Sequence, residues 1–406
     1  TGEVDYILVA KGVYQPDRGT GARAMAFVLV DGTEVHGGFD ATENDIVEAD
    51  HDLNVTTLSG AIGGAGNADN SFHVVVADAV GPFTRLEGFV IQKGFADGVP
   101  ALFQDRGAGV LALNAGPVIR DCWIRQNEST GSGGGVYGFQ SMLSIQNCRL
   151  NLNLAGGNGS AVAFWGGLSG IANSLIHGND HAGDGAVSLV TNAAALIVNT
   201  TIADNVSTAS GNGGVYVGPT ASVTLRNDIL WKNQGTFGSN EAQQLAGGGV
   251  VDIAATLLQG WSGFFGGPGN AGADPLFVDP VGPDMTRGTG DDDYHLRPTS
   301  PAIDNALSNL LPADVFPLDL SGDARFVDDL GTANMGGGPV TYLDRGCFEF
   351  QGSPCPSDLN ADGITNAMDL AILLGAWGTS GPADLNGSGS VEAADLAILL
   401  GSFGPC

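Results

Sequence analysis

Residues 119–127 read IRDCWIRQN, and four later stretches repeat their pattern: IQNCRLNLN at 145–153, IANSLIHGN at 171–179, IVNTTIADN at 197–205 and LRNDILWKN at 225–233. Each stretch begins with an aliphatic residue, has Asp or Asn two places later, and ends in Asn six places after that. The starting points lie 26, 26, 26 and 28 residues apart. A period of about 20–50 residues indicates that similar structural units are stacked on one another.

Apolar residues follow the same period. A Gly-rich turn leading into valine recurs at Val110, Val136, Val162, Val187 and Val215. Between the polar residue and the final Asn lies a branched aliphatic residue, namely Ile124, Leu150, Ile176, Ile202 and Leu230. These residues stand in short alternating runs broken by Gly and Asn, which is typical of short β-strands. Each repeat lacks a helical pattern, and this argues against leucine-rich and helical solenoids.

Several short strands in each lap, with successive laps about 4.8 Å apart, predict an all-β fold: a single-chain right-handed parallel β-helix. The recurring Asn side chains should then form ladders, because their amides can bond to the neighbouring lap. The alternative is a β-sandwich or propeller, but propeller blades are longer and hairpins would not hold this register. We expect the β-helix over residues 1–353, with clear rungs over about 105–260 and a closing segment over about 270–353.

Composition narrows the classes of function. The chain has 406 residues, a formal net charge of −29, 65 glycines and 43% hydrophobic residues. This hydrophobic content excludes general disorder, and the acidic balance argues against nucleic acid or anionic membrane as partners. The sequence contains no apolar run of transmembrane length. We therefore expect a secreted, extracellular or cell-surface protein that is able to bind cations.

The last 53 residues, 354–406, form a predicted separate module with two Ca²⁺ loops. Oxygen ligands occupy the spacing of a twelve-residue calcium loop, with Gly363 at the sharp turn; they are Asp358, Asn360, Asp362, the carbonyl of Ile364, Asn366 and Asp369. A copy 26 residues later offers Asp384, Asn386, Ser388, Ser390, Glu392 and Asp395. Ser388 stands where an acid is usual, so we expect the first site to bind Ca²⁺ more strongly than the second. Each loop opens an amphipathic helix.

Two tandem loops with Asp at the twelfth position, each followed by one helix, resemble a type I dockerin module. The resemblance implies docking onto a cohesin-like domain of a scaffold or cell surface. Recognition in that family uses the tenth and eleventh loop positions, here Ala367-Met368 and Ala393-Ala394, which are less polar than is usual. The alternative is a small Ca²⁺-stabilised domain that ends or tethers the chain.

Both ends of the predicted β-helix resemble bacterial extracellular proteins of the pectate-lyase-like superfamily. The opening residues 7–16 (ILVAKGVYQP) carry this resemblance, together with the closing residues 300–304 (SPAID) and 344–350 (DRGCFEF). In that superfamily a capping helix usually precedes the first strand. The present sequence lacks such a helix, so we expect an open first rung that another segment or another copy covers. A homo-oligomer or filament would result from the second arrangement.

Five cysteines are consistent with an oxidising compartment. Cys355 and Cys406 flank the C-terminal module, so we expect a disulfide bond between them. Cys122 and Cys148 lie in one column of adjacent laps and form either a disulfide or two buried thiols. Cys347 is left over.

Outward-facing positions of the laps supply the candidate sites. The candidate ligand-binding face consists of aromatic residues, on which sugar rings or a protein surface could stack unless a loop covers them: Tyr137, Phe139, Trp165, Tyr216 and Trp123. Arg125, Arg149 and His177 are the candidates for catalysis, because lyases of the resembling superfamily use Arg or Lys to abstract a proton beside a carboxylate. The rungs lack an acidic Ca²⁺ cluster and an evident pair of catalytic Asp residues.

These patterns predict a non-catalytic protein for carbohydrate or surface binding, or for extracellular assembly, anchored through its Ca²⁺ module. The alternative is a polysaccharide lyase or glycoside hydrolase that acts on acidic glycans and is delivered by the same anchor. The fold alone does not decide between the binding function and the enzymatic one.

Overall fold

A computed structural model of the chain describes residues 5–43, 45–64, 66–209, 211–236, 238–310, 317–329, 332–352, 357–360 and 364–405. The chain divides into two compact units. The first comprises residues 1–275, 279–294 and 345–347, and the second comprises 276–278, 295–344 and 348–406. Each unit is described separately below.

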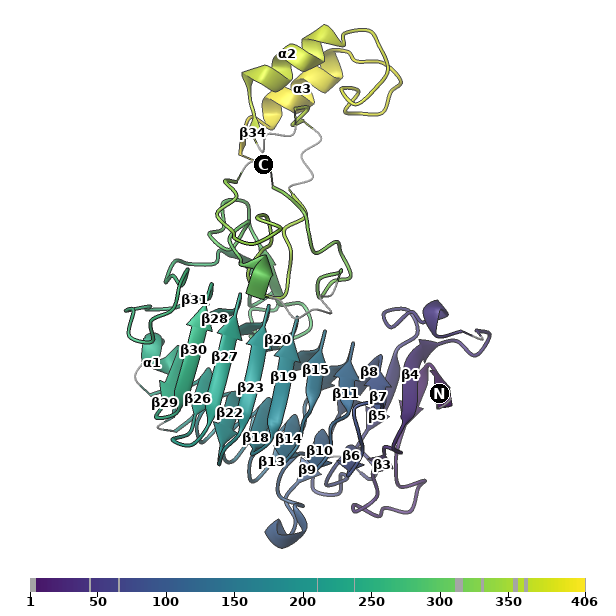
Figure 1. The fold of residues 1–406 in the computed structure, drawn as a ribbon. Coiled ribbons are helices and arrows are strands. Elements are labelled where there is room, and N and C mark those ends of the chain that lie inside the picture. The colour runs from purple at the N-terminus through teal and green to yellow at the C-terminus, as the bar shows by residue number, and fades with distance from the viewer. Residues whose placement is uncertain are drawn as a thin grey trace. The chain divides into compact units, whose positions relative to one another are not determined.

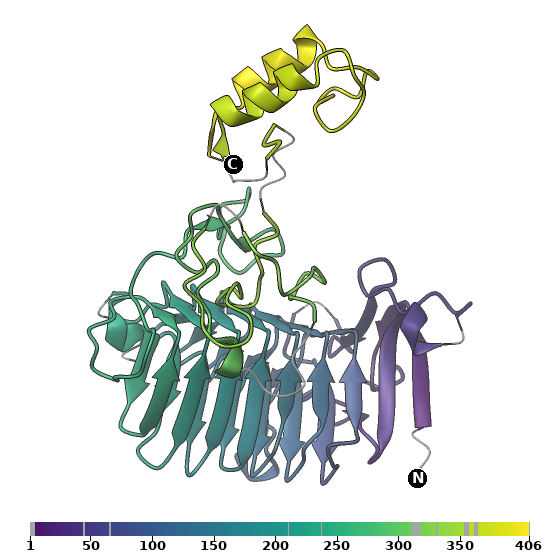
Figure 2. The same cartoon turned by 45° about the horizontal axis from the view of Figure 1, so that its top comes forward.

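The first unit is a parallel β-solenoid (Figures 1 and 2). Four sheets run along it, each built from one short strand per lap, and sheets A and B have nine strands, sheet C eight and sheet D five. Sheet A consists of β1 (Asp5–Ala10), β4 (Thr33–Phe39), β7 (Arg85–Glu87), β11 (Val118–Arg120), β15 (Ser144–Gln146), β19 (Leu168–Ala172), β23 (Ala194–Val198), β27 (Ser222–Arg226) and β30 (Val250–Ala254). Sheet B consists of β2 (Gly12–Tyr14), β5 (Thr56–Ser59), β8 (Phe89–Gln92), β12 (Trp123–Arg125), β16 (Arg149–Asn151), β20 (Leu175–His177), β24 (Thr201–Ala203), β28 (Ile229–Trp231) and β31 (Leu257–Leu258).

Sheets C and D complete each lap. Sheet C consists of β3 (Phe27–Val28), β6 (Val75–Asp78), β10 (Val110–Leu113), β14 (Val136–Phe139), β18 (Val162–Trp165), β22 (Val187–Val190), β26 (Val215–Val217) and β29 (Leu245–Gly247). Sheet D consists of β9 (Phe95–Ala96), β13 (Glu128–Ser129), β17 (Leu154–Ala155), β21 (Asp180–His181) and β25 (Val206–Ser207). The short helices η1 (Ile46–Glu48), η2 (Pro100–Leu102) and α1 (Glu241–Gln244) lie in insertions between strands.

Strand register confirms the repeat read from the sequence. Val136 pairs with Val110 on one side and with Val162 on the other. The predicted inward columns are at most 1% exposed: Val110, Val136, Val162, Val187, Val215, Ile124, Leu150, Ile176, Ile202 and Leu230. One continuous apolar core therefore fills the solenoid, because every lap contributes the same inward positions.

The first predicted ladder lies at the turn between sheets A and B, and we call it the outer ladder. Its members are Asp121, Asn147, Asn173, Asn199 and Asn227, and all have φ between 47° and 58°. Asn tolerates this left-handed conformation better than most residues do, which explains its recurrence. Asn147, Asn173 and Asn199 stand in single file, since they directly follow the register pairs Gln146↔Ala172 and Ala172↔Val198.

The second ladder, which we call the inner ladder, consists of Asn127, Asn153, Asn179, Asn205 and Asn233, each at most 1% exposed. The side-chain amides of the first four members each donate to the side-chain oxygen of the next Asn along the chain, over 2.9–3.1 Å. Asn233 closes the series by donating over 2.8 Å to Oε1 of Gln244 in α1. The sequence predicted the ladder but not its terminal glutamine.

Three cysteines among the described residues, Cys122, Cys148 and Cys347, are buried free thiols. Burial raises the pKa of the Cys122 thiol, and the neighbouring Cys148 raises it further. Of the two states expected for Cys122 and Cys148, the structure therefore has buried thiols. The expected Cys355–Cys406 bond lies outside the described residues.

The second unit contains the closing segment and the C-terminal module. Its elements include β32 (Phe277–Asp279), β33 (Asp293–Leu296), η3 (Ser308–Leu310), β34 (Ile364–Thr365), α2 (Ala367–Gly375), α3 (Ala393–Gly401) and β35 (Gly404–Pro405), although Asp279, Asp293 and Tyr294 belong to the solenoid unit. The two stretches with the family resemblance contact each other: the backbone N–H of Asp304 donates to Asp344 over 2.7 Å. Burial raises the pKa of Asp344 to about 8 and that of Glu349 to about 9.

Candidate functional site

The aromatic residues predicted as one binding face do not form one bare surface. Tyr137 is only 1% exposed, because the loop of residues 97–107 folds over it. The ring of Phe103 in this loop lies 5.3 Å from that of Phe139 and 6.5 Å from that of Tyr137. The guanidinium of Arg106 lies 5.4 Å from the centre of the Tyr137 ring. The chain itself therefore covers this end of the predicted face.

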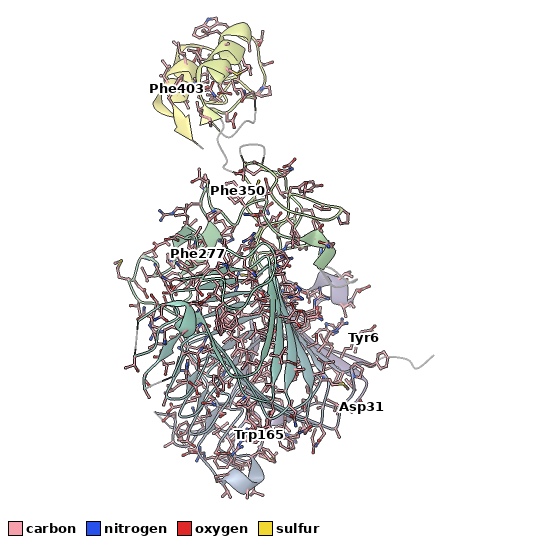
Figure 3. All side chains as sticks on the ribbon, turned by 60° about the vertical axis from the view of Figure 1, so that its left-hand side comes forward. Tyr6, Asp31, Trp165, Phe277, Phe350 and Phe403 are labelled. Carbon is pink, nitrogen blue, oxygen red and sulfur yellow. The ribbon has the colours of Figure 1, made fainter. Side chains whose placement is uncertain are left out.

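The remaining members of the predicted face lie apart from the covered pair. Trp165 on β18 is 39% exposed (Figure 3), and Tyr216 on β26 is half-buried. Trp123 belongs to β12 of sheet B and thus faces a different side of the solenoid. Its indole N–H donates to Asn151, and the guanidinium of Arg125 lies 4.0 Å from its ring centre. Of these aromatic side chains, Trp165 is the most accessible to a ligand.

The outer side of sheet B is covered along β16, β20 and β24 by residues 279–294, which we call the strap. Asn151 on β16 donates to the carbonyl of Gly288 over 2.7 Å. Arg287 donates to the carboxylate of Asp180 over 2.6 Å and to the carbonyl of Asp204 over 3.2 Å. The strap is thus fastened to three successive laps. The sequence did not reveal it, because its residues have no periodicity and their partners are distant in the chain.

His177, one of the catalytic candidates, lies under the strap. Its Nδ1 is 3.3 Å from Oδ2 of Asp292, and the two side chains are 4% and 0% exposed. Burial lowers the pKa of His177, although Asp292 acts in the opposite direction. Beside it, Tyr294 donates to Oδ2 of Asp204 over 3.1 Å, and burial raises the pKa of Asp204 to about 6. These groups hold the strap in place and leave His177 closed to a polymeric substrate.

Arg125 and Arg149 lie on neighbouring laps but in different columns. Arg149 pairs in register with Trp123, whereas Arg125 pairs with Asn151 and Asn151 pairs with His177. The backbone positions of the two arginines are therefore offset by two residues rather than paired directly. Burial lowers the pKa of Arg125.

The first predicted Ca²⁺ loop is closed by its twelfth residue, Asp369. This side chain is fully buried, and its Oδ1 accepts from the backbone N–H groups of Leu359 and Asn360 over 2.8 and 3.1 Å. Its Oδ2 accepts from the N–H of Asn366 over 2.8 Å, and Asn366 in turn caps α2. The ligand candidates Asp358 and Ile364 are described, whereas Asp362 lies outside the described residues.

The second loop repeats this arrangement. Asp395 is fully buried and accepts from the N–H groups of Asn386 and Glu392 over 2.9 and 2.7 Å. Burial acts to raise the pKa of Asp395, but these donors outweigh it and lower that pKa. Asp384 accepts from the N–H groups of Ser388 and Gly389 over 3.0 and 2.7 Å. These hydrogen bonds hold each carboxylate inside its own loop.

Helices α2 and α3 share a small core and leave much apolar surface outside it. The core is formed by Leu373, Ala383, Val391 and Leu399, each at most 4% exposed. The exposed apolar side chains of the two helices and of the residues just after them, each at least 40% exposed, are Met368, Ile372, Leu374, Trp377, Ile398, Leu400 and Phe403. Leu374 and Leu400 are counterparts 26 residues apart in the two halves of the module, and so are Trp377 and Phe403. An exposed apolar surface of this kind is typical of a protein-binding surface.

The fold and these sites define a parallel β-solenoid protein with a C-terminal two-helix module. No protein-family model matches its sequence, and no curated protein is similar to it. Among the described residues, no helix is long and apolar enough to cross a membrane.

Proposed function

We propose that this chain is an extracellular, non-catalytic binding protein. In this proposal, a right-handed β-helix presents a surface to a polysaccharide or a matrix, and a dockerin-like module attaches it to a partner protein in a Ca²⁺-dependent way. One observation carries the proposal. The buried twelfth residues Asp369 and Asp395 both gather amides of their own loops, and the helices that follow leave apolar side chains exposed.

Calcium binding completes both loops. The first is held by the side chains of Asp358, Asn360, Asp362, Asn366 and Asp369 with the carbonyl of Ile364. The second is weaker because Ser388 supplies a neutral oxygen where an acid is usual. The ligand carboxylates repel one another without a cation, so chelation loosens the module.

Titration of the full chain with Ca²⁺ by calorimetry tests this part. Asp369→Asn removes the tighter site and Asp395→Asn removes the weaker one, whereas Asp78→Asn, an exposed carboxylate on β6, leaves both intact. Equal Ca²⁺ binding by the parent and the Asp369→Asn variant contradicts the proposal.

The exposed apolar surface of α2 and α3 is the proposed docking surface for a cohesin-like domain of a scaffold. It includes the large side chains of Trp377 and Phe403, the kind of residue that dominates binding energy in protein interfaces. Trp377→Ala and Phe403→Ala should each weaken docking by at least about tenfold. Met142→Ala, which truncates a residue of the solenoid that is 62% exposed, is the matched control. Docking that persists unchanged in excess chelator counts against the proposal.

The solenoid is assigned a binding rather than a catalytic role. Burial of His177 against Asp292 of the strap supports this role, and exposed Trp165 offers a stacking surface for a sugar ring. Assays for unsaturated uronate absorbance and for new reducing ends on acidic glycans separate this role from lyase or hydrolase activity. Turnover that is lost in Arg149→Ala would overturn it.

Assembly through the first rung is a further part of the proposal. β1, β2 and β3 end the strand order of their sheets, and Tyr6, Val13 and Val28 on them are more than half exposed. Light scattering that finds monomers alone, with and without Ca²⁺, argues against a homo-oligomer or filament.

A further inference from the structure

The N-terminal end of the outer ladder is occupied by a histidine from a distant segment. Asp121 is the first ladder member, and the corresponding place in the preceding lap belongs to Gly88, next to the register pair Glu87↔Arg120. The ring of His51 fills the space that a ladder side chain would otherwise take. A Cβ on Gly88 would lie 2.2 Å from this ring, and a Cβ on Gly38 would lie 2.4 Å from it. These two glycines form a notch for His51.

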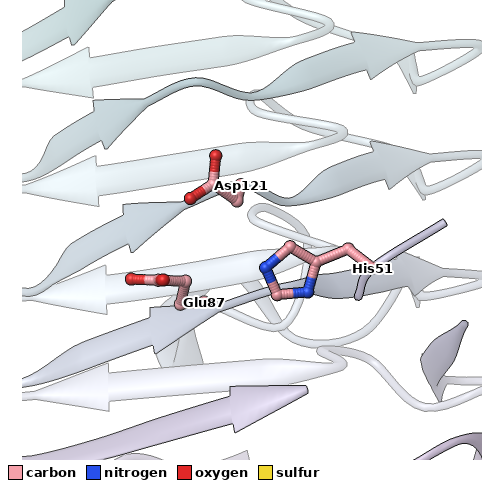
Figure 4. A group of neighbouring side chains, drawn as sticks. All are labelled: His51, Glu87 and Asp121. Carbon is pink, nitrogen blue, oxygen red and sulfur yellow. The ribbon is translucent and has the colours of Figure 1, made fainter. Parts of the chain in front are cut away.

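Three ligand-type side chains converge at this notch. His51, Glu87 and Asp121 each offer one ligand atom, and these atoms all lie within 4.8 Å of one another (Figure 4). This is the only group of three or more His, Cys, Asp or Glu side chains, among the residues described, that is close enough to share a metal ion. Nδ1 of His51 and Oε2 of Glu87 are buried without a hydrogen-bond partner. Buried polar atoms usually have a hydrogen-bond partner.

The charges around the notch favour a cation. Arg85 lies 3.5 Å from Glu34 and 3.6 Å from Glu87, and Arg120 lies 3.1 Å from Asp121. His36 also lies here, with its Nε2 3.1 Å from Glu34 and its Nδ1 3.9 Å from Glu87. Three carboxylates therefore face two guanidinium groups, and one negative charge is left over while His36 and His51 are neutral. Removing part of this charge from water without a counterion is unfavourable.

The outer ladder orients one of the carboxylates. Asn147 donates to Oδ1 of Asp121, and Asn173 donates to Oδ1 of Asn147 over 2.5 Å. These donors point toward the notch, so the positive ends of the amide dipoles face the Asp121 carboxylate. Hydrogen bonds that fix a ligating carboxylate from behind are a regular feature of metal sites.

We propose that His51, Glu87 and Asp121 bind a divalent transition-metal ion of the Zn²⁺ class. One imidazole nitrogen with two carboxylate oxygens suits Zn²⁺ or a similar ion, whereas Ca²⁺ and Mg²⁺ prefer oxygen ligands throughout. The ion joins the segment between β4 and β5 to the two following laps, and it closes the outer ladder at its open end. This site is separate from the Ca²⁺ loops of the second unit in sequence and in ligand chemistry.

The rival explanation is a protonated His51 that pairs with the two carboxylates and needs no metal. Asp121→Asn separates the two explanations with little risk to folding, because Asn stands at the same place in the four following laps. It removes a metal ligand while keeping the shape of the ladder. His51→Asn is the second variant, since it removes the imidazole and leaves Asp121 untouched.

The experiment titrates Zn²⁺ into the full chain by calorimetry, in excess Ca²⁺ so that the C-terminal loops are filled. We expect one Zn²⁺ per chain, and at least about tenfold weaker binding in Asp121→Asn and in His51→Asn. Asp252→Asn, which removes a carboxylate that is 63% exposed on β30, should bind like the parent. Anomalous scattering from crystals grown with Zn²⁺ should place the ion beside His51.

Two results overturn the proposal: no Zn²⁺ binding by the parent, or equal binding by the parent and Asp121→Asn. In either case an NMR titration that finds His51 protonated at neutral pH would establish the rival ion pair. Because Ca²⁺ binding is measured in a separate titration on Asp369→Asn, failure of the zinc site leaves the proposed function of the C-terminal module intact.

Discussion

The two Asn ladders use one residue type at one spacing, yet they differ in direction and in how they end. Amides of the inner ladder donate toward the C-terminal end, where Gln244 closes the series. In the outer ladder the amides of Asn147, Asn173 and Asn227 donate toward the N-terminal end, and the series finishes at the Asp121 carboxylate. The inner ladder is buried along its whole length, whereas Asp121 is 19% exposed. The repeated hydrogen bonds stabilise the solenoid in both ladders. The ladders differ in the group that ends each series, which is a neutral glutamine in the inner ladder and a carboxylate in the outer one.

Removing a central member of the inner ladder should have the largest effect. Asn179→Ala leaves the backbone and side-chain N–H groups of Asn153 without their acceptor and removes the donor to the carbonyl of Leu150. We expect a loss of about 4 kcal/mol in the free energy of unfolding, because several buried polar groups lose their partners. Urea unfolding of the full chain in saturating Ca²⁺, followed by circular dichroism, measures it. A loss below about 1 kcal/mol would mean that the ladder is not a main source of stability.

Removing the glutamine that closes the inner ladder should cost less. Oε1 of Gln244 accepts from the backbone and side-chain N–H groups of Asn233 over 3.1 and 2.8 Å. Gln244→Ala should therefore reduce the free energy of unfolding by about 2 kcal/mol in the same assay. Gln243→Ala truncates the neighbouring buried glutamine, whose Oε1 has no hydrogen-bond partner, and should cost clearly less. Equal losses in the two variants would refute a special role for Gln244.

The exclusion of solvent from the inner ladder can be tested through a neighbouring histidine. His181 is fully buried, and burial lowers its pKa, although its contact with the Asn212 carbonyl and the charges of Asp180 and Asp184 oppose this. The unfolded chain therefore takes up a proton below about pH 6.5 that the folded chain resists, and stability falls as the pH falls below that value. The expected contribution is up to about 1.4 kcal/mol per pH unit.

His181→Gln should remove this contribution. The free energy of unfolding, measured at several values between about pH 7 and 5, should then fall less steeply in the variant than in the parent. Identical slopes would show that solvent reaches the ring.

The smallest expected effect concerns the backbone of the outer ladder. Asn173 has φ of 47°, a conformation that costs alanine about 1 kcal/mol more than it costs glycine. Asn173→Ala should accordingly be about 1 kcal/mol less stable than Asn173→Gly, since both variants lose the same amide. Equal stability of the two variants would mean that Asn173 contributes to stability through its side chain alone, and not through its backbone conformation.

The periodic part of the fold could be predicted from the sequence, and the covering segments could not. The inward positions of Ile124 and Leu150 can be recognised in the sequence because an aliphatic residue recurs at this place once per lap. The loop with Phe103 and the strap with Asp292 occur once each, so their packing on distant strands leaves no pattern to read. His51 did leave an indirect signal: Gly88 interrupts a column that carries Asp or Asn in the next five laps, and a missing ladder side chain makes room for another group.

The strap also sets a limit on how the coil could lengthen. It starts beyond the last lap at β31 and returns to Asn151, Asp180 and Asp204, each of which sits at a fixed distance along the axis. Duplication of one lap after Asp204 would add about 4.8 Å to the span that the returning segment has to cross. A lap copied there would therefore have to be accommodated by the connection between β31 and the strap.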